Sequence, residues 1–163
     1  MTVKKFYKRL WVIIHLKQSG VPKLDILKMY YSLLRPVIEF ATPAYHTFLT
    51  AEQTNKLEAL QRLTMKIIFG WSVSYGTVLK ETDQVTLEKR REECVLKFAL
   101  KNEKNPRFVN KWFRENPPHE YRLRVREKYV IYAGKSIRFE KNPITYMTRL
   151  LNNYHAQNPP AAI

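Results

Sequence analysis

Residues 33–46, LLRPVIEFATPAYH, decide the fold because they combine a helical apolar pattern with two prolines. A proline lacks the backbone N–H, and its ring crowds the carbonyl four residues earlier, which costs about 3 kcal/mol in a helix interior. At about 100° per residue, Pro36 and Pro43 lie on nearly the same face of a helix, so their bends add. We expect the helix to curve here, or to break into a second short piece at Thr42–Pro43.

The helix that contains these prolines is expected to begin at Asp25, a residue type suited to the N-cap. Its polar stripe is narrow and the rest of its surface is apolar, which predicts a central place in the core. The prolines leave the carbonyls of Ser32 and Glu39 without a backbone donor. Both carbonyls lie on or near the polar stripe, so we expect water to satisfy them.

Cap and stop residues predict further helices on both sides of this segment. Residues 3–18 have helical periodicity and are followed by a glycine and a proline. Thr50 and Gln53 form a capping box for a helix that ends at Phe69, with Gly70 as its stop. Two more helices are expected to start at Ser74 and Thr86.

The chain changes character after Asn102, where prolines become frequent and the helical period is lost. We expect loops with one short turn at 107–113, and a weak strand or extended segment at 122–126 (RLRVR). Asn142 and Pro143 predict a last short helix that ends at Asn152. The predicted fold is therefore all-α: a small helical bundle over 1–104, then an irregular, loop-rich extension over 105–163 with a short final helix.

The composition of the chain indicates which partners and which cellular compartment to expect. The 163 residues carry a formal net charge of +15, which favours nucleic acid first and an anionic membrane second. The single cysteine, Cys94, excludes an internal disulfide and is expected to be a small core residue. The longest apolar run, LWVIIHL, is too short to span a bilayer, and no secretory cleavage site follows it. We expect an intracellular protein, nuclear or cytoplasmic, that is neither secreted nor bound to membranes.

The residues of catalytic and metal sites are missing from the sequence. Only two aspartates occur, Asp25 and Asp83, whereas a two-metal polymerase or nuclease site needs clustered carboxylates. The four histidines are scattered, and the four glycines form no phosphate-binding loop. We therefore expect no active site, no metal, no cofactor and no small-molecule ligand in this chain.

Four segments, in this order, resemble the region after the catalytic palm in reverse transcriptases of jockey-type non-LTR retrotransposons. They are LLRPVIEFATPAYH, KLEALQRLTMKIIFG (56–70), TLEKRREECVLKFALK (86–101) and IRFEKNPITYMTRLLN (137–152). The resemblance covers residues 3–152, and the departures from the family pattern are Phe40, Tyr45, Asn142 and Thr145. It implies a thumb, a helical domain that grips an RNA/DNA hybrid or RNA, followed by the family's C-terminal region. The palm and fingers of the polymerase would be supplied in cis or in trans, and this chain alone would not polymerise.

Three basic strips are candidates for nucleic-acid contacts. The first combines two cations, an amide and a small residue on the face opposite the apolar stripe of its helix: Asn55, Ala59, Arg62 and Lys66. The second is Lys4 and Lys8, with His15 on the same side of the helix, and the third is Arg122, Arg124 and Arg126. For each strip, an ordinary solvated surface remains the alternative.

Two residue groups are expected to be structural. Arg91 falls on the apolar side of its helix, which predicts a packed arginine with a carboxylate partner. Four aromatic residues could stack on single strands, but their helical spacing within apolar stripes predicts that they belong to the core: Trp11, Tyr30, Tyr31 and Phe98.

Two other functions remain open. The chain could be a stand-alone retroelement remnant that binds a protein partner. Its basic N-terminal helix could also lie on a membrane, although no anchor supports this interpretation.

Overall fold

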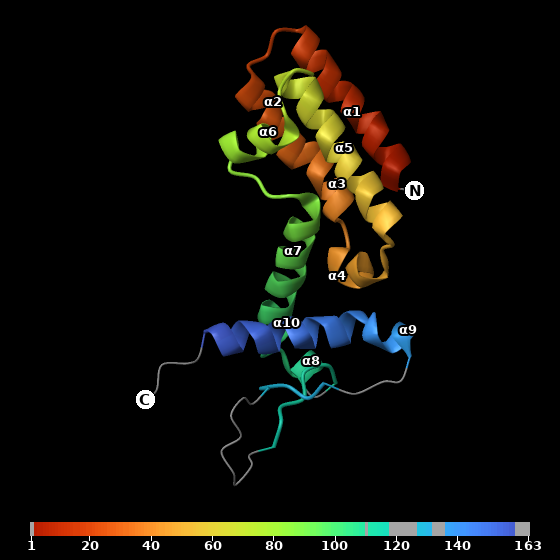
Figure 1. Cartoon of the computed structure of the whole chain (residues 1–163), viewed down its shortest axis with the longest axis vertical. Helices are drawn as coiled ribbons and strands as arrows, with labels where there is room; N and C mark the ends of the chain where they lie inside the picture. The colour runs from red at the N-terminus through yellow and green to blue at the C-terminus, as the bar shows by residue number, and fades with distance from the viewer. Residues whose placement is uncertain (1, 110, 118–126, 132–135, 159–163) are drawn as a thin grey trace. The chain divides into compact units, whose positions relative to one another are not determined.

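The computed structural model describes residues 2–109, 111–117, 127–131 and 136–158, and Figure 1 labels their helices. The fold is all-α, as predicted: the described residues contain helices and one isolated bridge between Glu115 and Tyr129, but no strand. The helices are α1 (Thr2–Gln18), α2 (Lys23–Met29), α3 (Arg35–Glu39), α4 (Thr42–Tyr45), α5 (Ala51–Phe69), α6 (Tyr75–Glu81), α7 (Leu87–Asn102), α8 (Pro106–Val109), α9 (Ile137–Glu140) and α10 (Pro143–Gln157). A π-helical turn (Tyr30–Leu34) joins α2 to α3, and a 3-10 turn (His46–Phe48) follows α4. No helix in the described part of the chain is long and apolar enough to cross a membrane.

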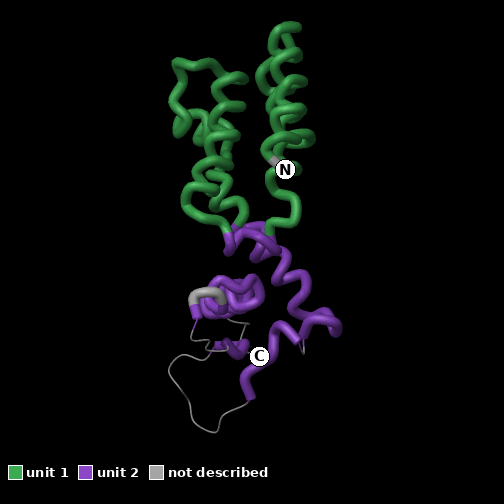
Figure 2. The backbone as a smooth tube through the Cα atoms, turned by 90° about the vertical axis from the view of Figure 1, so that its right-hand side faces the viewer, with its two compact units in different colours: residues 1–42, 49–91 green, residues 43–48, 92–163 purple. Residues whose placement is uncertain are grey.

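The chain divides into two compact units, which are coloured separately in Figure 2. The first unit contains residues 1–42 and 49–91, and the second contains residues 43–48 and 92–163. The division therefore falls inside α7, between Arg91 and Glu92, whereas the boundary predicted from the sequence follows residue 104. The short segment from 43 to 48 belongs to the second unit although its neighbours on both sides belong to the first.

The first unit is built around α5, which lies beside α1 in Figure 1 and packs against α1, α2 and α6. The residues that α1 contributes to the core, Phe6, Leu10 and Ile13, follow the three-to-four spacing of one helix face. They meet apolar residues of the α2–α3 segment, α5 and α6, and the first turn of α7 supplies the buried Leu87.

The proline-containing segment breaks, as predicted, but its details differ from the expectation. Helix α3 ends at Glu39, the backbone at Phe40 is extended, and Ala41 takes a positive φ of 57° before α4 begins at Thr42. The Glu39 carbonyl accepts a hydrogen bond of 2.7 Å from the buried Thr42 hydroxyl. A side chain therefore satisfies this carbonyl, and the prediction that water does so is wrong for Glu39.

Some of the predicted helix caps are present in the structure and one is not. The capping box of Thr50 and Gln53 is present, and Gly70 ends α5 with a φ of 111°, a conformation that favours glycine. Asp25, however, is not an N-cap: α2 begins at Lys23, and Asp25 lies in its first turn, paired with Lys28 at 2.9 Å.

The second unit has its own core, which brings together α7, α10 and the segments around Phe113 and Tyr129. The buried Asn152 binds the backbone of Tyr129 on both sides, accepting from its N–H and donating to its carbonyl at 2.9 Å each. Asn142 caps α10 as predicted, but the helix continues to Gln157, past the predicted end. Of the turn expected at 107–113, the structure shows α8, and residues 122–126 lie outside the described residues.

Candidate nucleic-acid interface

Helix α1 carries the least compensated positive charge in the described part of the first unit. Its sequence contains five lysines and arginines and no aspartate or glutamate. Four of these side chains, which we call the α1 cationic face, are exposed and form no ion pair with any described residue: Lys4, Lys5, Lys8 and Arg9. The structure thus places the predicted Lys4 and Lys8 on the surface, together with two further cations, Lys5 and Arg9.

Exposed aromatic side chains lie beside these cations on α1. Tyr7 is exposed, and Trp11 is 59% exposed with its ring centroid 3.8 Å from that of His15. The prediction that Trp11 belongs to the core is wrong, because the core stripe of α1 is narrow and runs through Phe6, Leu10 and Ile13. Of the other aromatic residues assigned to the core, Tyr30 is fully buried, while Tyr31 and Phe98 are half-buried.

A pocket of about 340 Å³ adjoins the α1 cationic face. It is lined by Lys5 and Arg9 from α1 and by Pro36, Val37 and Phe40 from α3 and the break that follows it. Arg9 Nη1 donates to the Leu33 carbonyl at 2.9 Å, which ties this side chain to the π-helical turn. Because the pocket depends on the packing of α1 against α3, no local sequence pattern could have revealed it.

The predicted stripe on α5 (Asn55, Ala59, Arg62 and Lys66) is largely exposed, with Lys66 half-buried. Both of its cations lie over aromatic rings: Arg62 Cζ is 5.3 Å from the ring centroid of Tyr75, and Lys66 Nζ is 5.3 Å from that of Trp71. Such contacts hold a cation in place without neutralising its charge. The α5 stripe is therefore present as a surface, but it carries fewer cations than the α1 cationic face.

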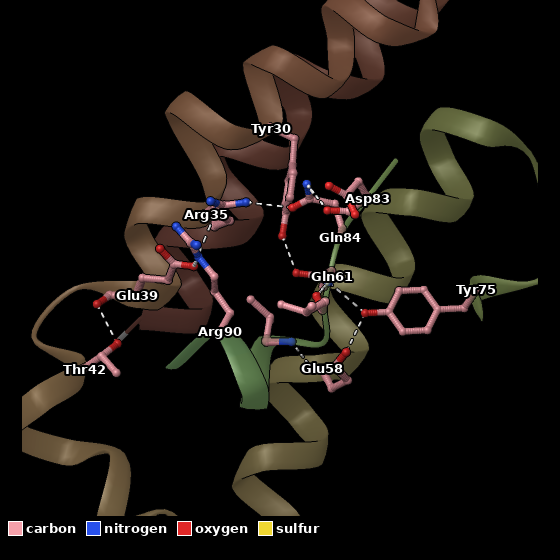
Figure 3. Close-up of polar contacts among 12 residues, drawn as sticks. Tyr30, Arg35, Glu39, Thr42, Glu58, Gln61, Tyr75, Asp83, Gln84 and Arg90 are labelled. Carbon is pink, nitrogen blue, oxygen red and sulfur yellow. Dashed lines mark hydrogen bonds and ion pairs between the residues drawn. The ribbon is translucent and has the colours of Figure 1, made fainter. Parts of the chain in front are cut away.

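A hydrogen-bond network, buried at Tyr30 and Gln61 and half-buried at Glu58 and Tyr75, fixes α5 against its neighbours (Figure 3). Tyr30 donates to Gln61 Oε1, and Gln61 Nε2 donates to the Tyr75 hydroxyl, both at 2.8 Å. Tyr75 in turn donates to Glu58 Oε1 at 2.5 Å, and Glu58 Oε2 accepts from the backbone N–H of Leu87 at 2.9 Å. Burial raises the pKa of both tyrosines above the ordinary value; for Tyr75 the hydrogen bond to Glu58 adds to this effect. The network joins the π-helical turn, α5, α6 and α7 within the first unit.

A second polar cluster shows which arginine of α7 has a carboxylate partner. Glu39 Oε1 lies 3.3 Å from Arg35 Nε and 3.2 Å from Arg90 Nε, and Arg35 also donates to Gln84 Oε1 at 3.0 Å (Figure 3). Arg91 is fully buried, as predicted, but its guanidinium has no hydrogen-bond partner among the described residues. The predicted carboxylate partner is therefore wrong for Arg91, and the neighbouring Arg90 is the residue that binds one.

In the second unit, a cavity of about 530 Å³ has Glu103, Lys128 and His155 in its wall. Glu103 Oε2 accepts from the Tyr129 hydroxyl at 3.3 Å and lies 2.8 Å from His155 Nε2. These contacts connect Glu103, the residue directly after α7, with the Tyr129 segment and α10. The Glu103 and His155 side chains are therefore explained as parts of the packing of the second unit. The basic strip Arg122, Arg124 and Arg126 lies outside the described residues.

The described residues show no metal site, and the comparisons find no relative, that would indicate a function for this chain. The described residues contain no group of three or more histidine, cysteine, aspartate or glutamate side chains that could hold a metal ion. Comparison of the chain with models of protein families, with curated proteins and with solved structures finds no match. The resemblance to reverse transcriptases therefore stays a prediction that rests on the four sequence segments.

Proposed function

We propose that this chain is a nucleic-acid-binding module with the role that its resemblance implies, the thumb of a retroelement RNA-directed DNA polymerase, without catalytic activity of its own. The observation that carries the proposal is the α1 cationic face, where four exposed cations have no carboxylate partner among the described residues. A phosphate backbone is the partner that such a surface attracts most strongly, because binding releases the counterions condensed on the nucleic acid.

The α5 stripe supplies a second contact surface on the same unit. Arg62 and Lys66 can meet phosphates while they stay over their aromatic rings, and Ala59 between Asn55 and Arg62 permits close approach of a groove. Contacts to backbone and groove shape hold a hybrid in register without reading its sequence. A thumb needs this kind of contact, because it follows a template of any sequence.

The test measures binding to an RNA/DNA hybrid, a DNA duplex and RNA by fluorescence anisotropy over a range of salt concentrations. Lys4→Ala/Lys8→Ala and Arg62→Ala/Lys66→Ala should each weaken binding about equally across sequences. Each pair should also flatten the log–log salt dependence by about one to two units, roughly one for each lost phosphate contact. Lys97→Ala/Lys101→Ala is the matched control, since it removes two exposed cations from α7 in the second unit. Effects of the same size for all three pairs would reduce the proposal to non-specific attraction by net charge.

Ala59→Arg separates a groove-facing helix from a merely basic one. The substitution adds charge, so a purely electrostatic surface would bind more tightly. A helix that tracks a groove would be held off by the bulk and bind more weakly. Tighter binding by Ala59→Arg, with an unchanged salt slope in Arg62→Ala/Lys66→Ala, would exclude the α5 stripe and leave the α1 cationic face as the contact surface.

One observation favours the alternative of a protein-interaction module. Leu24 and Trp71, both in the first unit, are largely exposed although they are apolar. A protein partner held by apolar area would keep its affinity as salt rises, whereas nucleic-acid binding would fall steeply. The salt titration described above therefore distinguishes the two functions.

A further inference from the structure

We propose that the pocket between α1 and α3 holds one unpaired nucleotide of a single-stranded nucleic acid. Its base would lie against Phe40 and the apolar wall, and its phosphate would lie at Lys5 and Arg9. The inference rests on the proposed nucleic-acid binding and adds to it a site for unpaired rather than paired nucleotides.

The composition of the pocket wall matches a nucleotide. Pro36, Val37 and Phe40 form its apolar part, while Lys5 and Arg9 are cationic. A nucleotide combines an aromatic base with an anionic phosphate, so it satisfies both parts at once. The volume of about 340 Å³ is at the lower end of the range for ligand pockets and suits one nucleotide unit. A duplex cannot use the apolar part, because its bases are stacked on one another.

The exposure of Phe40 is the feature that folding alone does not explain. Its side chain is 80% exposed, and it sits at the break where Ala41 takes a positive φ that β-carbon-bearing residues rarely adopt. The backbone conformation thus presents a large aromatic ring to solvent at the edge of a pocket. Base–aromatic stacking uses such a ring and tolerates any sequence, because every base has a π-face.

The two cations of the pocket are available for a phosphate. Lys5 has no hydrogen-bond or ion-pair partner among the described residues. Arg9 uses one N–H to bind the Leu33 carbonyl, which fixes its position, and a guanidinium has five N–H donors in all. Lys4 and Lys8 lie on the same helix, so a strand that leaves the pocket would continue along cationic surface.

A membrane surface fits these observations less well. An interfacial helix needs a broad apolar face. The core stripe of α1 (Phe6, Leu10 and Ile13) is buried, and its exposed apolar side chains form a separate, narrow row: Val3, Tyr7 and Trp11. The apolar part of the pocket consists of three residues beside two cations, which is enough area for one base.

The experiment compares single-stranded oligonucleotides with an RNA/DNA hybrid, using the whole chain and the variant Phe40→Ala. We expect Phe40→Ala to weaken single-strand binding about tenfold, since it removes one stacked base. Hybrid binding and the salt slope should not change, because no charge is lost. Phe40→Trp should restore single-strand binding. Phe48→Ala is the matched control, an exposed phenylalanine of the second unit that should leave binding unchanged.

A second variant tests the phosphate end of the pocket. Lys5→Ala/Arg9→Ala should weaken single-strand binding and lower the salt slope by about one to two units. A fluorescent adenine analogue in the oligonucleotide should change its emission on binding to the native chain and should not do so with Phe40→Ala. Circular dichroism should show that all variants stay helical, since the replaced side chains are exposed.

The outcomes separate this inference from the proposed function. If the native chain binds single strands and hybrid, and Phe40→Ala binds both equally well, the pocket is not a base site while nucleic-acid binding stands. If the native chain binds no nucleic acid at any salt concentration, both proposals fail. If Phe40→Ala instead loses binding to vesicles containing phosphatidylserine and keeps its affinity for oligonucleotides, the occupant is lipid and the inference is overturned.

Discussion

The buried amide of Gln61 gives the sharpest test of how the first unit is held together. Gln61 and Tyr30 are 3% and 1% exposed, and each satisfies the other at 2.8 Å. Gln61→Met keeps the length of the side chain but leaves the Tyr30 hydroxyl buried without an acceptor, which costs about 1–3 kcal/mol. The lost hydrogen bond to Tyr75 adds about 1 kcal/mol, because Tyr75 still has Glu58 as its acceptor.

The substitution of the other partner, Tyr30→Phe, removes the hydroxyl that donates to Gln61 Oε1. It leaves this buried oxygen without a donor, again at a cost of about 1–3 kcal/mol. In the double variant no buried group of this pair lacks its partner, and replacing both partners by apolar groups is close to neutral. We therefore expect the double variant to be less destabilised than the sum of the single variants, by about 1–3 kcal/mol.

Because the chain divides into two compact units, a local measurement of the free energy of unfolding is preferable to a global one, namely amide hydrogen exchange in the buried turns of α5. Tyr7→Phe is the control: its hydroxyl is on an exposed residue, and its effect should stay within about 0.5 kcal/mol. Strictly additive costs in the cycle, or a Gln61→Met variant as stable as the native chain, would refute the role assigned to the network.

Two further predictions concern ionisable groups in the first unit. The raised pKa values of Tyr30 and Tyr75 mean that the folded chain keeps both phenolic protons while the unfolded chain loses them above pH 10. Their contribution to stability is therefore complete below about pH 10 and is lost as pH rises towards the folded-state pKa values. The loss is about 1.4 kcal/mol per pH unit for the buried Tyr30 and smaller for the half-buried Tyr75, because solvent screens its hydroxyl. Urea unfolding of Tyr75→Phe should show a shallower alkaline decline. Arg91→Met should be neutral or stabilising, by up to about 4 kcal/mol in thermal unfolding, because it removes a buried charge that has no partner among the described residues. A loss of about 3 kcal/mol or more would instead show that the Arg91 guanidinium is compensated in the folded chain.

The parts of the fold that follow from local hydrogen bonds were predictable from the sequence. The Thr50–Gln53 capping box, the stop at Gly70 and the N-cap at Asn142 need only residues within one helical turn, and all three are present. The prediction that Asp25 is an N-cap also used only local sequence, and it is wrong. Helix α2 begins two residues earlier, and the Asp25 carboxylate pairs with Lys28 instead of capping the helix.

The features that depend on packing were not predictable. On α5, Gln61 and Met65 are buried while Leu57 and Leu63 are only partly buried, so the core arc is rotated from the one that apolarity alone indicates. The rotation has a polar cause, because Tyr30 and Tyr75 come from other segments and satisfy the Gln61 amide. Arg90 and Arg91 differ in partners for the same reason: Glu39 approaches one of them from a distant part of the sequence.

The candidate site contains residues of both kinds: some that the local sequence predicts and some that depend on packing. Charge and helical spacing predict that Lys4 and Lys8 are exposed, and this survives folding because exposed cations need no partner. The same features do not predict a site at Lys5, Arg9 and Phe40, because their common pocket exists only where α1 meets the end of α3.

The structure around the end of α3 shows how the chain tolerates two prolines within residues 33–46. Pro43 cannot donate to the Glu39 carbonyl, but the hydroxyl of Thr42, the residue directly before it, makes that hydrogen bond from a fully buried position. The break is therefore compensated locally, which removes much of the cost that a proline imposes on a helix interior. What the break changes is the direction of the chain at Phe40 and Ala41, and with it the exposure of an aromatic ring beside Lys5 and Arg9. A continuous helix would place residue 40 one turn after Pro36 on the same side, without the extended backbone that now separates Phe40 from α3. In the proposed nucleotide site, Pro36 thus forms part of the wall, and the break before Pro43 places Phe40 at its edge.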